Sequence, residues 1–160
     1  MRDLISGVRA AALATGLVAV GLMGAMAGSA EAADGQAGGP RLYSCKVQSY
    51  EKHGWIAPEV LIFVDHGEKF VGVLDGIIYN TQKRAEFVEY DPRSKQRLKL
   101  KWTLNNVGSR SGSTKVSYTA TLDERRMKVS LTARVHGYDN RPPGSGPCTV
   151  SNKRPKHFTK

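Results

Sequence analysis

Three stretches in the second half of this chain alternate strictly between apolar and polar side chains, over residues 97–104, 114–122 and 127–136. In the first, every second position from Leu98 to Leu104 is apolar, and Arg, Lys or Thr occupies the positions between them. Successive side chains of a β-strand point to opposite faces, whereas an α-helix repeats every 3.6 residues. A period of two is typical of antiparallel strands with one face in a core and one in solvent. We therefore expect each stretch to be a half-buried strand.

The first half of the chain holds further short apolar runs. We expect strands over residues 42–50, 60–64, 69–74, 77–80 and 83–90, because Gly, Pro, Asp and Asn residues typical of turns separate these runs. No sustained helical period occurs beyond the N-terminal segment. About eight short strands predict an all-β domain, either a single small antiparallel β-barrel with a lipocalin-like meander or a two-sheet sandwich.

The N-terminal segment, residues 1–32, is predicted to be a signal peptide. Arg2 and Arg9 precede an apolar run over residues 10–28, and residues 30–32 (Ala-Glu-Ala) have the spacing that signal peptidase recognises. The run is nearly long enough to be a membrane anchor, but its Ala and Gly content and the cleavage site favour removal. We expect a mature chain without a transmembrane segment, located in the periplasm or secreted.

The remainder is predicted to be one domain. Residues 33–40 are Gly-rich and are expected to be a flexible lead-in, and residues 41–150 should form the β domain. Residues 151–160 are polar and basic, and we expect a disordered tail there. We expect the protein to be a monomer.

The two cysteines of the chain, Cys45 and Cys148, lie near opposite ends of the predicted domain. In an oxidising compartment such a pair is expected to form a disulfide. The bridge would close a loop of about a hundred residues, which the chain-entropy model values at about 4–5 kcal/mol. Neither a C-x-x-C motif nor a His/Cys spacing points to a redox or metal role. We expect a structural disulfide that makes the first and last strands neighbours.

The formal net charge of +10 is unevenly distributed. Residues 33–91 hold 6 Lys and Arg against 9 Asp and Glu, a net of −3, whereas residues 92–160 hold 16 against 3, a net of +13. The polar positions of the three alternating strands carry part of this charge, interleaved with Ser and Thr. If Leu122 pairs with Met127 across a turn over residues 123–126, Lys115 lies opposite Arg134.

This charge predicts a surface that binds anions. The side chains expected to supply the field are Lys99, Lys101, Lys115, Lys128 and Arg134. The alternative is a solvated strand surface, on which cations only discourage edge-to-edge association.

A second candidate site lies on two loops, residues 53–59 and 136–141, which the disulfide would bring together. Their aromatic and polar side chains include Trp55, Tyr138, Asp139 and Arg141, which could surround a ligand at a barrel mouth. The alternative is a plug, in which Trp55 closes the core and Tyr138 packs over the disulfide. Residues 142–147, rich in Pro and Gly, and residues 105–113, rich in Gly and Ser, are expected to be loops.

No motif of the sequence points to an enzyme, a metal site or a cofactor. The four His residues lack ligand spacing, no nucleophile elbow occurs, and Gly144-Ser145-Gly146 lacks the strand-to-helix context of a phosphate loop. The basic charge would suit nucleic acid, but the export signal argues against it.

In layout, the chain resembles the periplasmic lysozyme inhibitors and the small lipocalin-like binders, which are exported β-barrels with one bridge between near-terminal cysteines. It departs from both patterns. The Ser-Gly-x-x-Tyr loop of the inhibitors is absent, Gly54-Trp55 is too short for a lipocalin signature, and the net charge is opposite to that expected of an inhibitor of cationic lysozymes. The resemblance covers layout alone.

These observations predict an exported, non-enzymatic binding module of the cell envelope. Its ligand would be an anionic envelope component, such as lipopolysaccharide, a lipid headgroup or an acidic polymer, and peripheral membrane contact fits the basic tail. The alternative is a protein-interaction or inhibitor module that uses the aromatic loops to hold a protein partner. A small hydrolase is the third hypothesis.

Overall fold

The computed structural model describes residues 39–88, 90–91, 96–109 and 112–158. The signal peptide over residues 1–32 lies outside the described residues and stays a prediction. The described elements are β1 (Arg41–Lys46), β2 (Glu59–Asp65), β3 (Phe70–Asp75), α1 (Gly76–Gln82), β4 (Glu86–Val88), β5 (Tyr90–Asp91), β6 (Arg97–Ser109), β7 (Gly112–Asp123), β8 (Lys128–Val135), β9 (Pro143–Ser151) and the 3₁₀ turn η1 (Lys156–Phe158).

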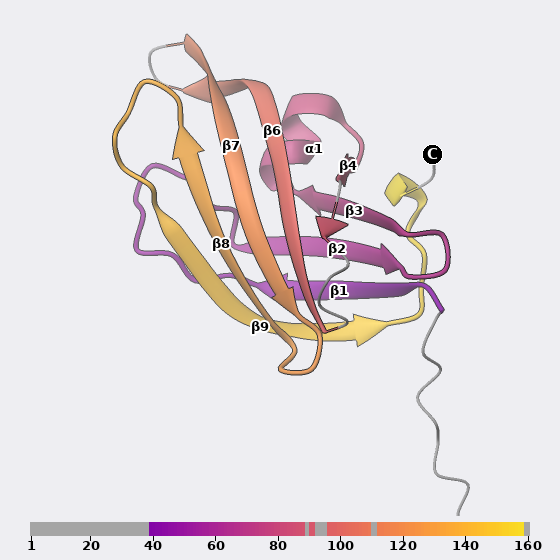
Figure 1. Cartoon of the computed structure of the whole chain (residues 1–160). Helices are drawn as coiled ribbons and strands as arrows, with labels where there is room; N and C mark the ends of the chain where they lie inside the picture. Colours follow the sequence, from indigo (N-terminus) through magenta and orange to yellow (C-terminus); the bar gives the residue numbers. More distant parts are fainter. Residues whose placement is uncertain (1–38, 89, 92–95, 110–111, 159–160) are drawn as a thin grey trace, which may run out of the picture. The chain divides into compact units, whose positions relative to one another are not determined.

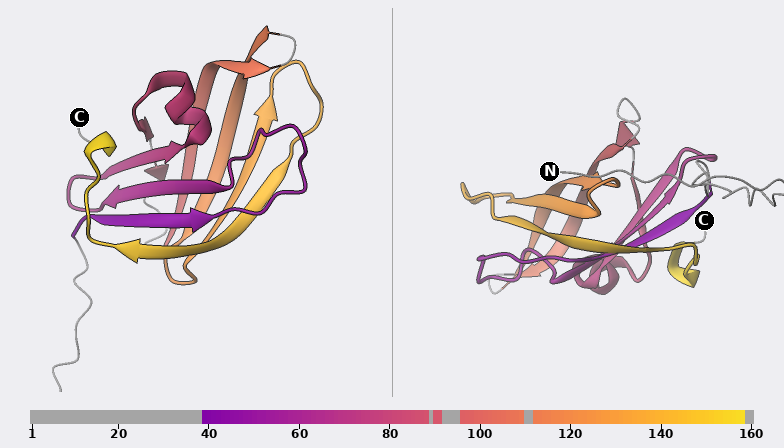
Figure 2. Two further views of the ribbon diagram at one scale, coloured as in Figure 1. Left: turned by 180° about the vertical axis from the view of Figure 1, so that it is seen from behind. Right: turned by 90° about the horizontal axis from the view of Figure 1, so that it is seen from below.

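The strands form a nearly closed antiparallel β-barrel (Figures 1 and 2). Their order is β4-β3-β2-β1-β9-β8-β7-β6-β5, and residue 89 alone separates β4 from β5 in the sequence. The two ends of the sheet order are therefore consecutive in the chain, and β4 with β5 counts as one strand of eight. The predicted all-β barrel is confirmed, and it is the barrel rather than the sandwich that forms.

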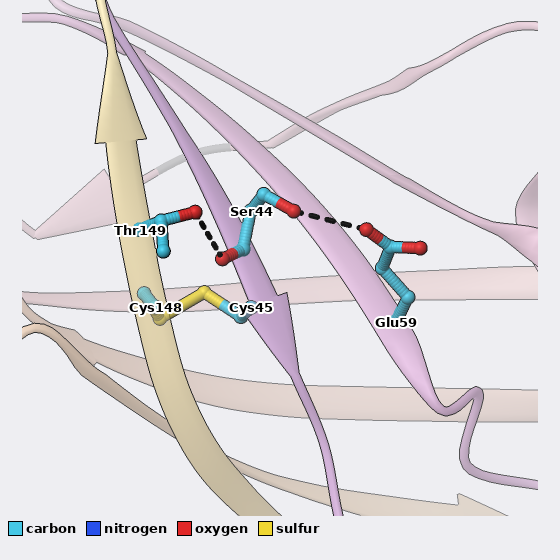
Figure 3. The surroundings of a disulfide bond; sticks show 5 residues. All are labelled: Ser44, Cys45, Glu59, Cys148 and Thr149. Carbon is cyan, nitrogen blue, oxygen red and sulfur yellow. Dashed lines mark hydrogen bonds between the residues drawn. A yellow bond between two sulfur atoms is a disulfide. The ribbon is translucent and has the colours of Figure 1, made fainter.

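The predicted disulfide is also confirmed. Cys45 of β1 and Cys148 of β9 are paired residues of adjacent strands and are bonded to each other across a sequence separation of 103 (Figure 3). Beside the bridge, Ser44 donates a hydrogen bond from Oγ to Glu59 Oε1 at 2.9 Å, and Thr149 Oγ1 donates to the Ser44 carbonyl at 3.4 Å. The first and last strands are thus neighbours, as expected.

The three alternating stretches are strands β6, β7 and β8, and their apolar positions face the core. Trp102 and Tyr118, for example, are paired across β6 and β7 and stack with ring centroids 5.1 Å apart. Both strands run farther than predicted, because residues 105–109 and 112–113 continue the ladder instead of forming a loop. A bulge between Leu104 and Val107, where Asn106 has a φ of 60°, accommodates this extension.

The register predicted for β7 and β8 is wrong by one residue on each strand. Asp123 pairs with Lys128, so the turn spans residues 124–127 rather than 123–126. Asp123 Oδ1 accepts a hydrogen bond from the backbone N–H of Arg126 at 2.9 Å, and Met127 takes a φ of 50° that places it in the turn. In consequence Lys115 does not lie opposite Arg134.

Residues 77–80, predicted to be a strand, belong instead to helix α1. Asp75 caps the helix by accepting a hydrogen bond from the Ile78 N–H at 2.7 Å, and Lys83 ends it with a φ of 62°. Ile78 alone of the helix is fully buried. One short apolar run does not distinguish a strand from a helical turn, and here the cap decides.

The Pro- and Gly-rich residues 143–147, predicted to be loop, form the first half of β9. This half pairs with β8, and the second half pairs with β1. A Cβ on Gly146 would lie 1.7 Å from the Lys46 carbonyl oxygen, and one on Gly144 would lie 2.8 Å from Val47 Cγ1. Glycine is therefore required where the chain after β1 passes close over β9.

The outer face of β2 and β3 is covered by an aromatic cluster that we define as the four phenylalanines of the chain: Phe63, Phe70, Phe87 and Phe158. Phe158 of η1 is fully buried, with its ring centroid 5.6 Å from that of Phe63. The sequence predicts a disordered tail over residues 151–160, but in the structure residues 156–158 pack beside β3 (Figure 1). The single apolar residue of the tail has a place in the core.

Candidate functional site

The outward side chains of β6, β7 and β8 form a surface that we call the cationic face. It contains five of the predicted cations, all exposed: Lys99, Lys101, Lys115, Lys128 and Arg134. Hydroxyl side chains lie between them in cross-strand rows: Lys99–Thr121–Ser130, Lys101–Thr119–Thr132 and Thr103–Ser117–Arg134. The face is thus built as expected, although the correct register places Arg134 opposite Ser117.

Acidic groups neutralise little of this charge. Arg97 Nε lies 3.0 Å from Asp123 Oδ2 at the edge of the face. The Arg126 N–H and the Arg97 guanidinium hold the pKa of Asp123 below its ordinary value. Within the described part of the chain, none of the five cations of the cationic face forms an ion pair. In the ladder, however, Asp91 is paired with Lys99 and Asp123 with Lys128, so part of the repulsion among the five cations is compensated at the edges of the face.

A hollow of about 550 Å³ opens on the cationic face, and we call it the outer hollow. The outward side chains that line it are Lys101, Thr103, Ser117, Thr119, Thr132, Arg134 and Arg141. Trp102 and Tyr118 complete the lining, but their side chains are buried, so they contribute backbone to its floor.

Three cations from three different segments surround the outer hollow. Lys101 comes from β6 and Arg134 from β8, and both face outward by strand alternation. Arg141 comes from the loop before β9, which is held against β8 by a hydrogen bond of 3.0 Å from the Ala133 N–H to the Pro142 carbonyl. The loop thus brings Arg141 to the strand that bears Arg134.

The hydroxyls of the outer hollow differ in their partners. Ser117 Oγ lies 3.0 Å from Thr103 Oγ1 and 2.9 Å from His136 Nε2, so its position is held by a small network. Thr119 and Thr132, which pair across β7 and β8, make no side-chain hydrogen bond to another described residue. Their hydroxyls are available to a ligand.

Of the nine side chains predicted to bind a ligand, the structure brings Lys101, Arg134 and Arg141 together in the outer hollow. Lys99 and Lys128 lie on the same face outside the hollow. Lys115 lies beside His136 instead, with its carbonyl accepting a hydrogen bond from the His136 N–H at 2.9 Å. The remaining three are the loop residues Trp55, Tyr138 and Asp139.

Trp55 has the features of the predicted plug. It is half-buried and packs against the core. Its backbone N–H donates to Glu51 Oε2 at 2.8 Å, and its backbone carbonyl accepts from the Tyr118 hydroxyl at 3.1 Å. Tyr138 is 56% exposed and therefore does not pack over the disulfide as that alternative supposed. The described residues show no hydrogen bond, ion pair or ring contact that joins Trp55 to Tyr138 or Asp139.

Two exposed tyrosines, which we call the exposed aromatic pair, are Tyr50 and Tyr138, and of these only Tyr138 was predicted from the sequence. Tyr50 is fully exposed because β1 ends at Lys46, not at residue 50 as predicted, which leaves it in the loop before β2. This loop lies beside the one that carries Tyr138 (Figures 1 and 2). Ser49 Oγ joins the two segments by donating to the Pro143 carbonyl at 2.7 Å. The signal for Tyr50 was the Ser-Tyr-Glu-Lys run, which is too polar for a strand interior.

A separate polar cluster holds the β7–β8 turn against the first half of the barrel. The buried Tyr43 hydroxyl donates to Glu124 Oε1 at 2.6 Å, and His66 Nε2 lies 3.1 Å from the same oxygen. Burial, with the neighbouring Glu124 carboxylate, raises the pKa of Tyr43 to about 12. The described residues contain no group of three or more His, Cys, Asp or Glu that could hold a metal ion. The contacts of Tyr43 and His66 with Glu124 join the turn to β1 and to the segment after β2.

No protein-family model matches the chain, and comparisons with curated proteins and with solved structures also find no match. Among the described residues, no helix has both the length and the apolar character needed to span a membrane.

Proposed function

We propose that the protein is an exported, non-enzymatic binding module of the cell envelope that holds an anionic ligand or surface on its cationic face. The observation that carries the proposal is the set of five exposed cations on three adjacent strands, none of which forms an ion pair among the described residues. Cations gathered on one face repel one another, and an anion placed among them relieves that repulsion. The disulfide supports a location in an oxidising compartment outside the cytoplasm.

The test is co-sedimentation of the mature chain with vesicles of phosphatidylglycerol and with vesicles of phosphatidylcholine, across ionic strength. We expect binding to the anionic vesicles alone, with an affinity that falls as salt rises, because salt screens exposed charges beyond about 10 Å at 0.1 M. No binding at low salt would contradict the proposal.

A pair of matched double variants separates the cationic face from net charge. Lys99→Gln/Lys101→Gln removes two cations from the face, and Lys46→Gln/Lys52→Gln removes two exposed cations from the first half of the chain. We expect the first variant to weaken vesicle binding much more than the second. Equal weakening would mean that the total charge of the protein, and not the cationic face, attracts the vesicle.

A second candidate function, a protein-interaction or inhibitor module, is favoured by the exposed aromatic pair. Tyrosine gives a large contact area with few rotatable bonds and is enriched at protein interfaces. The test is a pull-down from envelope extract with Tyr50→Ala/Tyr138→Ala as the variant, because Trp55 packs against the core and its replacement would disturb folding. A specific partner that this variant loses, and that Lys99→Gln/Lys101→Gln retains, would favour the second function.

A further inference from the structure

We propose that the outer hollow is a site for one phosphate monoester group, held by Lys101, Arg134 and Arg141 above the hydroxyls of Thr119 and Thr132. This inference rests on the proposed function and names the chemical class of the anion. It also makes the hollow distinct from the rest of the cationic face, which would only attract anions at longer range.

The spacing of the strands suits a single anion between the cations. Lys101 and Arg134 lie on strands separated by β7 and are offset by two residues along the strands, so their backbones are roughly 12 Å apart at a strand spacing of about 4.8 Å and a rise of about 3.4 Å per residue. Both side chains are long enough to converge over the strand between them. Arg141 approaches from the side of β8, where the Pro142 carbonyl is bonded to the Ala133 N–H. One anion over the Thr119–Thr132 pair would therefore lie among the three cations that line the hollow.

The number and geometry of the donors favour phosphate over a carboxylate. A phosphate monoester carries a charge of about −1.5 to −2 at neutral pH and has three strong acceptor oxygens. The planar guanidinium of Arg matches two of those oxygens in a bidentate pair. A carboxylate has one charge and two acceptor oxygens, so it would compensate less of the charge of the three cations and offer fewer acceptor sites to the hydroxyls.

The hydroxyls of the outer hollow and its volume also favour a phosphate monoester. The hydroxyls of Thr119 and Thr132 lie between the cations in the cross-strand order Lys101–Thr119–Thr132 and are free to donate. A volume of about 550 Å³ exceeds what a phosphate group alone requires, so the organic part of a monoester can lie in the same hollow. Asp139, two residues before Arg141 in the chain, forms no ion pair with it among the described residues.

The primary test is titration of the mature chain with glycerol 3-phosphate, inorganic phosphate and acetate at constant ionic strength, followed by amide chemical shifts or calorimetry. We expect saturable binding of both phosphates, with shifts centred on residues 117–119, 132–134 and 141, and no saturable binding of acetate. Acetate binding as tight as phosphate binding would overturn the proposal.

Matched variants on the same strands distinguish a site from a diffuse field. Arg134→Gln should weaken glycerol 3-phosphate binding by about tenfold or more, because it removes a charge-assisted bidentate contact. Lys128→Gln, on the same face of β8 but outside the hollow, should weaken it by less than about threefold, as expected of a screened rim charge. Thr119→Val should weaken binding by roughly two- to tenfold, the value of one hydrogen bond, whereas Thr121→Val should leave it unchanged.

These results separate the inference from the proposed function. If Arg134→Gln and Lys128→Gln weaken binding equally while the chain still binds anionic vesicles, the site is wrong and the cationic face stands. If neither vesicles nor phosphate bind at low salt, both are wrong. The four substituted side chains, Arg134, Lys128, Thr119 and Thr121, are solvent-accessible on the strand surface, so the variants should fold. An unchanged thermal melt followed by circular dichroism verifies this.

Competition identifies the source of the phosphate. Vesicles that contain phosphatidic acid present a monoester headgroup. If glycerol 3-phosphate displaces the protein from them, the hollow takes a lipid headgroup. If the protein binds glycerol 3-phosphate but does not bind these vesicles, the ligand is a soluble monoester.

Discussion

The two halves of the barrel wall differ in whether their outer faces are covered or exposed. Over β2 and β3 the outer face is closed by the aromatic cluster, with Phe158 from the end of the chain packed on Gly72. Over β6, β7 and β8 the outer face is open, exposed and cationic. The core side of both halves is filled by apolar side chains. The C-terminal segment thus covers the outer face of one wall and leaves the cationic face of the other exposed.

The same difference is visible in the burial of each strand. All six residues of β3 are buried, whereas β6 alternates between buried and exposed positions. A strand covered on both faces requires a continuous apolar run, and a strand covered on one face requires alternation. Residues 70–74 are such a continuous run, and the presence of a second covering layer could have been inferred from it.

The largest expected effect comes from breaking the covalent link between the two halves. Cys45→Ala/Cys148→Ala should lower the free energy of unfolding by about 4–5 kcal/mol, because the disulfide restricts the unfolded chain over a loop of about a hundred residues. Urea denaturation measures this change. The wild-type protein in reducing buffer is the control and should match the variant, and equal midpoints for the oxidised and reduced proteins would contradict the expectation.

Uncovering the first half should be the next largest effect. Phe158→Ala removes a fully buried ring and should cost about 3–5 kcal/mol, while Tyr138→Ala, on an exposed loop, should stay within about 0.5 kcal/mol. Thermal and urea unfolding of both variants test this.

A double-variant experiment tests the contact between Gly72 and Phe158. Gly72→Ala should lower the free energy of unfolding less in the Phe158→Ala background than alone, since its Cβ would lie 2.6 Å from Phe158 Cδ1. Additive costs would mean that Phe158 does not lie over Gly72.

Two aspartates, one in each half, should give opposite responses to pH. Burial raises the pKa of Asp75, so the folded protein gains stability from this group as pH falls through the raised pKa toward the ordinary value of 3.8. The Arg126 N–H and the Arg97 guanidinium lower the pKa of Asp123, so its contribution is present above 3.8 and is lost as pH falls through the lowered pKa. On acidification, the wild type should therefore gain stability relative to Asp75→Asn and lose it relative to Asp123→Asn. Melting temperatures between pH 7 and pH 3 measure both differences, and a common sign would refute the assignment.

The smallest effect is expected on the cationic face itself. Lys99→Gln and Lys101→Gln should each change the free energy of unfolding by no more than about 0.5 kcal/mol, because neither side chain is buried or ion-paired among the described residues. Urea denaturation tests whether the variants and the wild type have equal free energies of unfolding. If they do, the two variants are suitable for binding experiments. A large loss of stability in either would show that the cation supports the fold.

Several features were predictable because they depend on local pattern or on chain chemistry. The faces of β6, β7 and β8 follow from alternation, and the disulfide was expected from two cysteines in a chain with a predicted signal peptide. The cations of the face were found for the same reason, since alternation assigns Lys101 and Arg134 to the solvent side.

Other features depend on local caps that an alternation pattern does not show, or on contacts between segments that are far apart in the sequence. The register of β7 and β8 changed because Asp123 caps its own turn, and α1 formed because Asp75 caps a helix. Arg141 joins Arg134 only because a loop hydrogen bond holds it against β8, and no spacing in the sequence reveals that contact. Gly144 and Gly146 likewise have a meaning only once the segment after β1 crosses β9.

From its residue order alone, this chain was bound to form short antiparallel strands, to bridge its two cysteines and to carry its positive charge on the later strands, because each of these follows from neighbouring residues or from composition. The closure of the barrel, the covering of one wall by Phe158 and the hollow that joins Lys101, Arg134 and Arg141 were decided only in three dimensions. Each of them is a contact between residues distant in the chain, and the pairing of β1 with β9, together with the return of the C-terminal segment over β3, brings such residues together.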